Sequence, residues 1–288
     1  MAADKVLVLG HTGLVGRAVM AASGGRYLAP AGGRREFDLT RPRSMQRLLE
    51  RTRPAAVINC AGFTDVDACE SQPELAMAVN AAGPEALAAA CARVGAHLVH
   101  LSTDFVFGPG HRRPISESDP PAPLNHYGRS KLAGERRAAA AWDQCLVVRV
   151  AWVFGPAKPT MVDKMLARAR RGEKLRVVTD QVGSPSYSRD LAPVLLELAR
   201  RRVTGILHLV NQGQVSRFGL VVRALELAGL DPALAEPVDS RELGLPARRP
   251  EYSVLDCRRL RRVYPAGLPA WTDALARHLG VKPEGDND

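Results

Sequence analysis

Aromatic side chains are scarce in this sequence, and together they make up 5% of the 288 residues. None of them alternates with the paired arginines, such as Arg112-Arg113 and Arg170-Arg171, that raise the formal net charge to +10. Proteins that bind single-stranded nucleic acid place aromatic stacking platforms beside their basic groups. The composition therefore argues against a nucleic-acid partner. We interpret the arginines as side chains on solvated helix faces. Some of these arginines could instead hold an anionic nucleotide substrate or cofactor.

Long apolar runs and paired cysteines are also missing. No apolar run reaches the roughly 18–20 residues that span a bilayer, and residues 1–5 lead straight into a strand without the apolar region of a secretion signal. The sequence has five scattered cysteines without metal-ligand spacing: Cys60, Cys69, Cys91, Cys145 and Cys257. We interpret them as free thiols of a cytoplasmic protein, and we predict neither a metal site nor a membrane partner.

The first half of the sequence alternates apolar runs with helical segments. We predict buried strands at 6–9, 56–60, 97–102 and 145–150, and a weak one at 27–29. Between them we predict helices at 14–22, 44–51 and 73–93, the last broken near Gly83-Pro84, and a helix that contains Tyr127. This alternation predicts an α/β fold with a Rossmann-type, doubly wound parallel sheet. Ligands of such sheets bind at the carboxyl ends of the strands.

The second half is less regular. We predict helices at 161–171, 190–201, 218–230 and 271–279, strands at 175–178 and 206–210, and mainly loop at 234–256. The strand at 206–210 is apolar enough to return to the main sheet. We therefore assign residues 1–150, with about 181–211, to the nucleotide-binding domain. Residues 151–180 and 212–288 form a smaller, C-terminal substrate-binding lobe.

A glycine-rich turn follows the first predicted strand. Its glycines, at positions 10, 13 and 16, let the turn and the next helix approach a pyrophosphate, whose charge the helix N-terminus favours. A purely structural turn could use the same glycines, but the strand–turn–helix context favours a dinucleotide site. The candidate cofactor residues of this turn are Gly10, Thr12, Gly13, Leu14, Val15 and Gly16.

The residues after the second strand indicate which nicotinamide cofactor is used. An acid there accepts hydrogen bonds from the ribose diol, whereas arginines favour a 2′-phosphate. No acid follows 27–29 directly, and Arg34 and Arg35 come next. We therefore predict NADPH, with NADH as the alternative. Asp38 and Leu39 follow slightly later and could cover the adenine.

Thr103, Tyr127 and Lys131 can form a proton-transfer triad. Tyr127 and Lys131 lie one helical turn apart on one helix face. An ammonium beside a phenol lowers the pKa of the phenol, so Tyr127 could exchange a proton with a carbonyl or alcohol oxygen. Thr103, at a strand end, would hold that oxygen. The alternative for Tyr127 is an ordinary packing residue on an amphipathic helix.

Several stretches together resemble one family, the extended short-chain dehydrogenase/reductases, and within it the dTDP-4-dehydrorhamnose reductase family. The resemblance runs nearly end to end. The glycine turn and the segment 127–135 are shared across the superfamily, and the stretches around Trp152 and at 180–185 are typical of the narrower family. The remaining similar stretches are 59–67, 102–107, 149–155 and 248–250.

The resemblance implies NAD(P)H-dependent reduction of a 4-keto-6-deoxyhexose carried on a nucleoside diphosphate, dTDP being favoured. It assigns catalysis to Thr103, Tyr127 and Lys131. It also implies that Asp104, Phe105 and Trp152 line the sugar site, with Thr103 holding the substrate oxygen. The residues that it places around the cofactor are Ala61, Gly62, Thr64 and Asn80, together with Tyr127 and Lys131.

Related activities remain as alternatives. Sugar-nucleotide dehydratases carry an Asp-Glu pair after the threonine, whereas Phe105 follows Asp104 here and cannot abstract a proton. A nucleotide-sugar epimerase needs only the triad and a retained cofactor. A non-catalytic, NADP-binding regulatory subunit resembling that of methionine adenosyltransferase is a third reading. Arg17-Ala18-Val19 stands where metal-bridged dimers have a glutamate, so we predict no metal and leave monomer and homodimer open.

Overall fold

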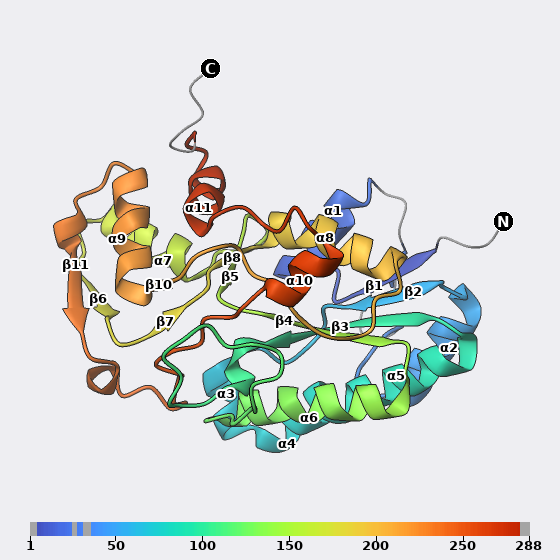
Figure 1. Cartoon of the computed structure of the whole chain (residues 1–288). Helices are drawn as coiled ribbons and strands as arrows, with labels where there is room; N and C mark the ends of the chain where they lie inside the picture. The colour runs from blue at the N-terminus through green and yellow to red at the C-terminus, as the bar shows by residue number, and fades with distance from the viewer. Residues whose placement is uncertain (1–4, 25–27, 31–35, 283–288) are drawn as a thin grey trace.

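The computed structural model describes residues 5–24, 28–30 and 36–282. A parallel five-stranded sheet lies at its centre, in the order β1-β2-β3-β4-β9 (Figure 1). The strands are β1 (Val6–Leu9), β2 (Ala56–Asn59), β3 (His97–Thr103), β4 (Cys145–Val150) and β9 (Gly205–His208). Strand β9 pairs with β4, which confirms the predicted return of the chain to the main sheet. The weak strand at 27–29 is reduced to a bridge between Leu28 and Leu7, and Tyr27 lies outside the described residues.

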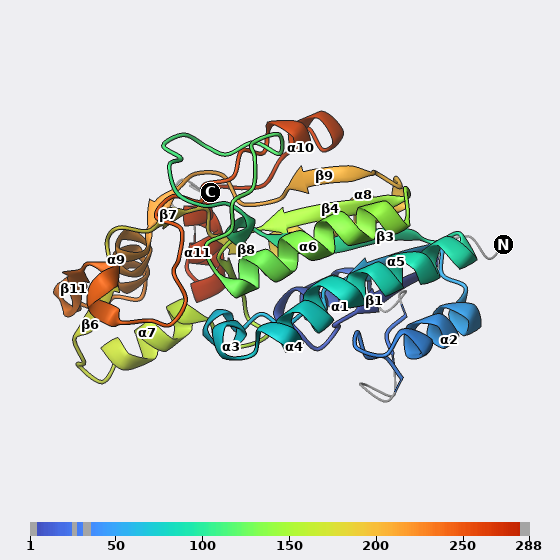
Figure 2. The same ribbon diagram turned by 90° about the horizontal axis from the view of Figure 1, so that it is seen from below.

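Helices cover both faces of the sheet, because the strands are apolar on both sides (Figure 2). Val6 and Val8 pack with α1 (Leu14–Ala22) and α8 (Ser188–Arg200). Leu7 and Leu9 alternate with them and face the other layer. That layer consists of α2 (Pro42–Thr52), α5 (Gly83–Val94) and α6 (His126–Ala141). The predicted doubly wound α/β fold is confirmed.

Residues 73–94 form one helical stretch with an irregular centre. It runs through α4 (Pro73–Met77), a π-helical turn η2 (Ala78–Ala82) and α5, so the predicted break before Gly83-Pro84 is a π turn rather than an interruption. Of the helices that the structure describes, this stretch alone is long and apolar enough, by length and composition, to cross a membrane. Half of its apolar window is buried inside the protein, as expected for a core helix.

A second hydrophobic core lies beyond the carboxyl ends of the strands. It is formed by α7 (Met161–Ala169), α9 (Arg217–Leu227) and α11 (Trp271–Leu279) around the paired strands β6 (Leu175–Val178) and β11 (Ala235–Val238). The prediction of mainly loop at 234–256 is wrong for β11, because Pro237 hid this edge strand. Shorter elements complete the chain: α3 (Val66–Ser71), η3 (Asp104–Val106), β5 (Val153–Phe154), β7 (Val182–Gly183), β8 (Ser186–Tyr187), β10 (Val215–Ser216), η4 (Pro232–Leu234), η5 (Ser240–Leu243) and α10 (Arg258–Val263).

Candidate active site

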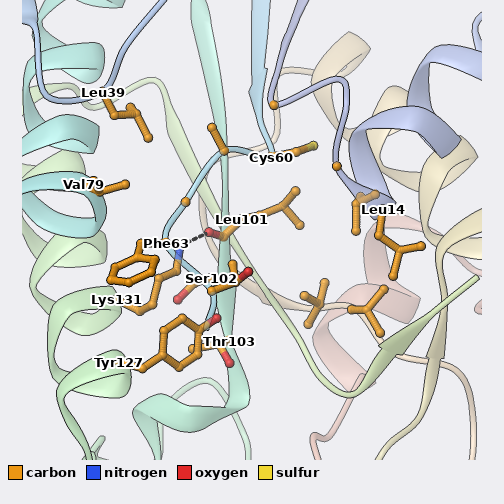
Figure 3. Close-up of a pocket in the computed structure, with 18 of the residues that line it drawn as sticks. Leu14, Leu39, Cys60, Phe63, Val79, Leu101, Ser102, Thr103, Tyr127 and Lys131 are labelled. Carbon is orange, nitrogen blue, oxygen red and sulfur yellow. Dashed lines mark hydrogen bonds between the residues drawn. The ribbon is translucent and has the colours of Figure 1, made fainter. Parts of the chain in front are cut away.

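A cavity of about 1210 Å³ opens at the carboxyl ends of the strands (Figure 3). Gly10 enters it after β1, Cys60 after β2, Thr103 at the end of β3 and Trp152 after β4. Arg217, at the start of α9, brings in the second lobe. The carboxyl ends of neighbouring parallel strands thus meet in one site, as predicted for a doubly wound sheet.

The glycine turn forms one end of this cavity, and close packing explains two of its glycines. Gly10 has a φ of +70°, and a Cβ there would lie 2.5 Å from the backbone nitrogen of Ala61. A Cβ on Gly16 would lie 2.2 Å from the Gly10 oxygen. Gly13 caps α1 without any side-chain hydrogen bond, so the first N–H groups of the helix have no side-chain cap. A diphosphate fits this turn because it would accept those N–H groups.

Helix α6 carries Tyr127 and Lys131 and is fixed at its start. The Oδ1 atom of Asn125 accepts a hydrogen bond from the Gly128 backbone at 2.7 Å, and its amide donates to the Arg248 carbonyl at 2.7 Å. A Cβ on Gly128 would lie 2.1 Å from the Phe105 oxygen. The helix therefore packs tightly against the end of β3, and Figure 3 shows Tyr127 and Lys131 beside Thr103.

Lys131 is buried at the base of the cavity, with 4% of its surface exposed. Its ammonium donates a hydrogen bond to the Leu101 carbonyl at 2.6 Å. Burial lowers the pKa of Lys131 to about 8, because desolvation disfavours the charged form, while the negative charge of Glu135 opposes this shift. The Lys131 ammonium is therefore mostly charged at neutral pH, and it loses its proton as the pH rises through about 8.

Tyr127 has the opposite shift from the one predicted. Burial raises the pKa of its phenol, and the interaction with the Thr103 hydroxyl opposes this effect only in part. The prediction that Lys131 lowers the pKa of Tyr127 is wrong for this structure, because the ammonium is directed to Leu101 and desolvation dominates. The phenol is consequently protonated at neutral pH, which is the state that a proton donor requires.

Thr103 and Asp104 are held by a chain of hydrogen bonds. The Thr103 hydroxyl donates to the Asp104 carboxylate at 3.1 Å and accepts from the Phe105 backbone at 3.2 Å. The other Asp104 oxygen accepts a hydrogen bond from Ser253 at 2.6 Å. Burial raises the pKa of Asp104 to about 6, and the bond from Ser253 opposes the shift. Ser253, distant in sequence, thereby orients the end of β3.

A buried ion pair lies behind Lys131. Arg149 donates to Glu135 twice, at 2.9 and 2.6 Å, and each side chain is 2% exposed. Ser102 also donates to Glu135. Arg149 and Ser102 both donate to the Glu135 carboxylate, so this buried charge is paired and hydrogen-bonded. It joins α6 to the two strands that carry Thr103 and the segment before Trp152.

Most of the predicted cofactor and substrate residues line the cavity: Gly10, Thr12, Gly13, Leu14, Val15, Asp38, Leu39, Ala61, Gly62, Thr64, Thr103, Asp104, Phe105, Tyr127, Lys131 and Trp152. Gly16 and Asn80 are not among the lining residues. Gly16 packs against the turn, and Asn80 binds both the N–H and the carbonyl of Phe63 from behind, at 2.8 and 2.9 Å. Arg34 and Arg35 lie outside the described residues.

The lining residues that the sequence did not single out include Phe37, Lys158 and Arg217. The Arg217 guanidinium stacks on the Trp152 ring at 3.6 Å. Trp152 itself has a φ of +44°, which is unusual for a bulky residue. Arg217 lies one position before the predicted helix at 218–230, so only the folded chain reveals that it meets Trp152.

Known proteins are similar to this chain in sequence and in fold. The family profile described as the RmlD substrate binding domain matches residues 4–282. The dTDP-4-dehydrorhamnose reductase of Mycobacterium tuberculosis is 44% identical over 252 residues, which cover 85% of this chain and 82% of the relative. The dTDP-4-keto-6-deoxy-D-glucose reductase of Streptomyces niveus is 34% identical over 276 residues, or 95% and 96% of the two chains.

A solved structure gives the same result. The crystal structure of dTDP-4-dehydrorhamnose reductase from Bacillus anthracis in complex with NADP superposes with a TM-score of 0.90 at 30% identity. The match covers 96% of this chain and 98% of that one. Since the family profile, the relatives and the fold all agree, the chain belongs to the dTDP-4-dehydrorhamnose reductase family of the extended short-chain dehydrogenase/reductases.

Proposed function

We propose that this protein uses NADPH to reduce the 4-keto group of a dTDP-linked 4-keto-6-deoxyhexose. One observation carries the proposal. Thr103, Tyr127 and Lys131 line the same cavity as a glycine turn whose helix N-terminus has no side-chain cap. A proton donor and a diphosphate-binding turn in one cavity are what the reduction of a carbonyl by a nicotinamide dinucleotide requires.

Each member of the triad has a separate task. Tyr127, protonated because of its burial, donates the proton to the carbonyl oxygen of the sugar. The Thr103 hydroxyl, oriented through Asp104, holds that same oxygen. Lys131 provides positive charge beside the developing alkoxide and binds the ribose of the cofactor. A bound reduced nicotinamide supplies the hydride to the carbonyl carbon.

The surroundings of Asp38 support NADPH over NADH. An acid that selects NADH must offer its carboxylate to the ribose diol. One Asp38 oxygen instead accepts hydrogen bonds from both the backbone and the hydroxyl of Thr40, at 2.8 and 2.7 Å. This oxygen is satisfied within its own turn. The preference for a 2′-phosphate then rests on Arg34 and Arg35, as proposed from the sequence.

The cellular compartment and the oligomeric state are also part of the proposal. All five cysteines are free thiols in the described structure, in keeping with a reducing cytoplasm. Among the described residues, no cluster of three or more histidine, cysteine or acidic side chains could hold a metal ion. Because Arg17-Ala18-Val19 stands where metal-bridged dimers have a glutamate, we expect a monomer or a homodimer that does not need a bridging metal.

Two substrates test the proposal directly. We expect oxidation of NADPH, faster than of NADH, with dTDP-4-dehydrorhamnose or dTDP-4-keto-6-deoxy-D-glucose. Tyr127→Phe should reduce kcat by about 100-fold or more, since it removes the proton donor. Tyr264→Phe, a change outside the cavity, is the matched control. Normal NADPH binding without oxidation of the cofactor by either substrate would contradict the proposal and favour an epimerase or a regulatory subunit.

A further inference from the structure

Arg217 is a cation in the cavity that the reaction described above does not use. Its guanidinium lies over the Trp152 ring, and the negative charge of Asp104 acts on it. Among the described residues, none forms a hydrogen bond or an ion pair with this guanidinium. Arginine carries five N–H donors in a planar fork. The structure thus presents a charged group with unused donors in the wall of the cavity.

The position of Arg217 is fixed by its backbone. Its N–H donates to the Gln181 carbonyl at 3.0 Å, and the preceding Ser216 caps α9 by accepting from Gly219 at 3.0 Å. Strand β10, which ends at Ser216, pairs with β7. Arg217 is the first residue of an 11-residue helix, so the positive end of the helix dipole lies at the same wall.

Trp152 fixes the plane of the guanidinium. On one side the indole is in contact with Gly183, where a Cβ would lie 2.5 Å from the Trp152 Cε2 atom. The ring also carries the Arg217 guanidinium at 3.6 Å from its centroid. Little rotational freedom is left to either group. A guanidinium held in this way loses less entropy when it binds a ligand than a lysine on a flexible stem would.

We propose that Arg217 binds the diphosphate of the nucleotide-linked sugar. This inference rests on the proposed function and specifies which residue holds the substrate's charge. A guanidinium fork matches two phosphate oxygens, and hydrogen bonds between charged groups are stronger than neutral ones. The cofactor has a separate diphosphate site in the glycine turn, at the N-terminus of α1. Asp104 and Thr103 are left to contact the sugar.

Binding of thymidine, dTMP and dTDP, measured by titration calorimetry with saturating NADPH, tests this role. We expect Arg217→Met to weaken dTDP binding by about 10- to 100-fold, the effect of losing hydrogen bonds to a charged group. Thymidine, and NADPH titrated in a separate experiment, should bind as in the unaltered protein. Arg217→Lys should lose less, because it keeps the charge but not the fork. Arg223→Met, on the same helix and ion-paired to Glu226, is the control.

Three results would overturn the inference while leaving the reductase activity in place. The first is unchanged dTDP binding by Arg217→Met. The second is an equal loss for thymidine and dTDP, which would mean that Arg217 only supports Trp152. The third is weakened NADPH binding with normal dTDP binding. Failure of the proposed function is a different observation, in which the unaltered protein binds NADPH but oxidises it with neither substrate. If that protein also does not bind dTDP, the inference is removed as well.

Discussion

Single residues in this site have pKa values that burial controls more than neighbouring charges do. The pKa of Lys131 is lowered, and the pKa values of Asp104 and Tyr127 are raised. In each case desolvation is the largest cause. The site at neutral pH therefore contains a neutral phenol, a lysine near its titration point and a carboxylate close to gaining a proton. Perturbed groups that share one cavity are typical of catalytic sites.

The raised pKa of Asp104 predicts a pH-dependent cost to stability. Its pKa is about 6 in the folded protein against 3.8 for an ordinary aspartate. The favourable contribution of protonated Asp104 is complete below about pH 3.8 and is lost as the pH rises through about 6. Asp104→Asn should therefore gain stability over the unaltered protein across this window, by at most about 3 kcal/mol. Urea unfolding at pH 4.5 and pH 7.5 measures the difference.

Asp65→Asn is the matched control, because it changes an exposed aspartate at the start of α3. This variant should keep nearly the same stability at both pH values, since asparagine caps a helix about as well as aspartate. An equal change in the free energy of unfolding at the two pH values for Asp104→Asn would contradict this prediction. The pKa of Asp104 would then be near that of an exposed carboxyl.

Residue patterns predicted the site residues that lie in local sequence motifs. They did not predict the residues that reach the site from distant segments. Gly10, Thr103, Tyr127 and Lys131 stand in local motifs whose spacing carries their chemistry. Arg217 and Ser253 act through contacts with residues 65 and 149 positions away, Trp152 and Asp104. No periodicity within one element encodes such long-range contacts. The direction of the Tyr127 pKa shift is not predictable from the local pattern for a similar reason, since the shift depends on burial by distant segments.

At the scale of elements, the π turn η2 explains how Asn80 serves two neighbours. Its side chain binds both backbone groups of Phe63 and also donates to the Ser130 hydroxyl at 3.0 Å. The loop at 61–64, which lines the cavity, is thereby joined to α6. Asn80 is 1% exposed, so none of these bonds competes with water. An element that is irregular in its backbone thus supports a regular site.

Asn80→Ala should therefore impair cofactor binding without touching the cofactor cavity. Three hydrogen bonds are lost and the N–H of Phe63 loses its partner, so we expect about 2–4 kcal/mol less stability. The Kd for NADPH should rise several-fold, because the loop at 61–64 loses its support. Asn211→Ala is the matched control, as Asn211 is equally buried but binds Tyr187 and Asp190 instead. Equal effects of both variants on NADPH binding would contradict this role.

The elements themselves were predictable where pattern and length agreed. The helices at 14–22 and 271–279 have the bounds that periodicity and punctuation predicted. Strand β11 was missed because a proline in a four-residue edge strand removes the usual signal. The sequence predicts a break where the structure has a π turn, since glycine and proline are typical of helix ends. Short elements whose partners are far away in sequence carry too little local information.

At the scale of the whole molecule, residues 247–256 connect the region of the second hydrophobic core to α6, which carries Tyr127 and Lys131. Arg249 donates to Asp67 at 2.9 and 2.6 Å, and the Arg248 carbonyl accepts from Asn125, the cap of α6. Ser253 reaches Asp104 from the same segment. This segment therefore contacts α3, the start of α6 and η3 within a few residues. We propose that this segment relays the position of the second hydrophobic core to the side chains proposed to contact the sugar.

A double-mutant cycle on Asp67 and Arg249 measures this connection. The pair is bidentate and partly buried, with side chains 35% and 16% exposed, so we expect a coupling energy of about 1–2 kcal/mol, above that of most surface pairs. Asp67→Asn and Arg249→Met should raise KM for the sugar nucleotide more than KM for NADPH. The exposed pair Arg176–Glu242, in the same lobe, is the control cycle. If the effects of the two changes add, both on the free energy of unfolding and on KM for the sugar nucleotide, the ion pair does not align the lobes.

The long separation between Gly10 and Ser253 also orders events during synthesis. A chain emerging from the ribosome can form β1 to β4, the glycine turn and α6 well before the segment at 247–256 has been made. Such a nascent chain already has the elements that we expect to bind the cofactor. Asp104 does not yet have its hydrogen bond from Ser253, because the segment at 247–256 has not been made. We therefore expect a growing polypeptide that recognises a dinucleotide early and gains its sugar specificity among its last translated segments.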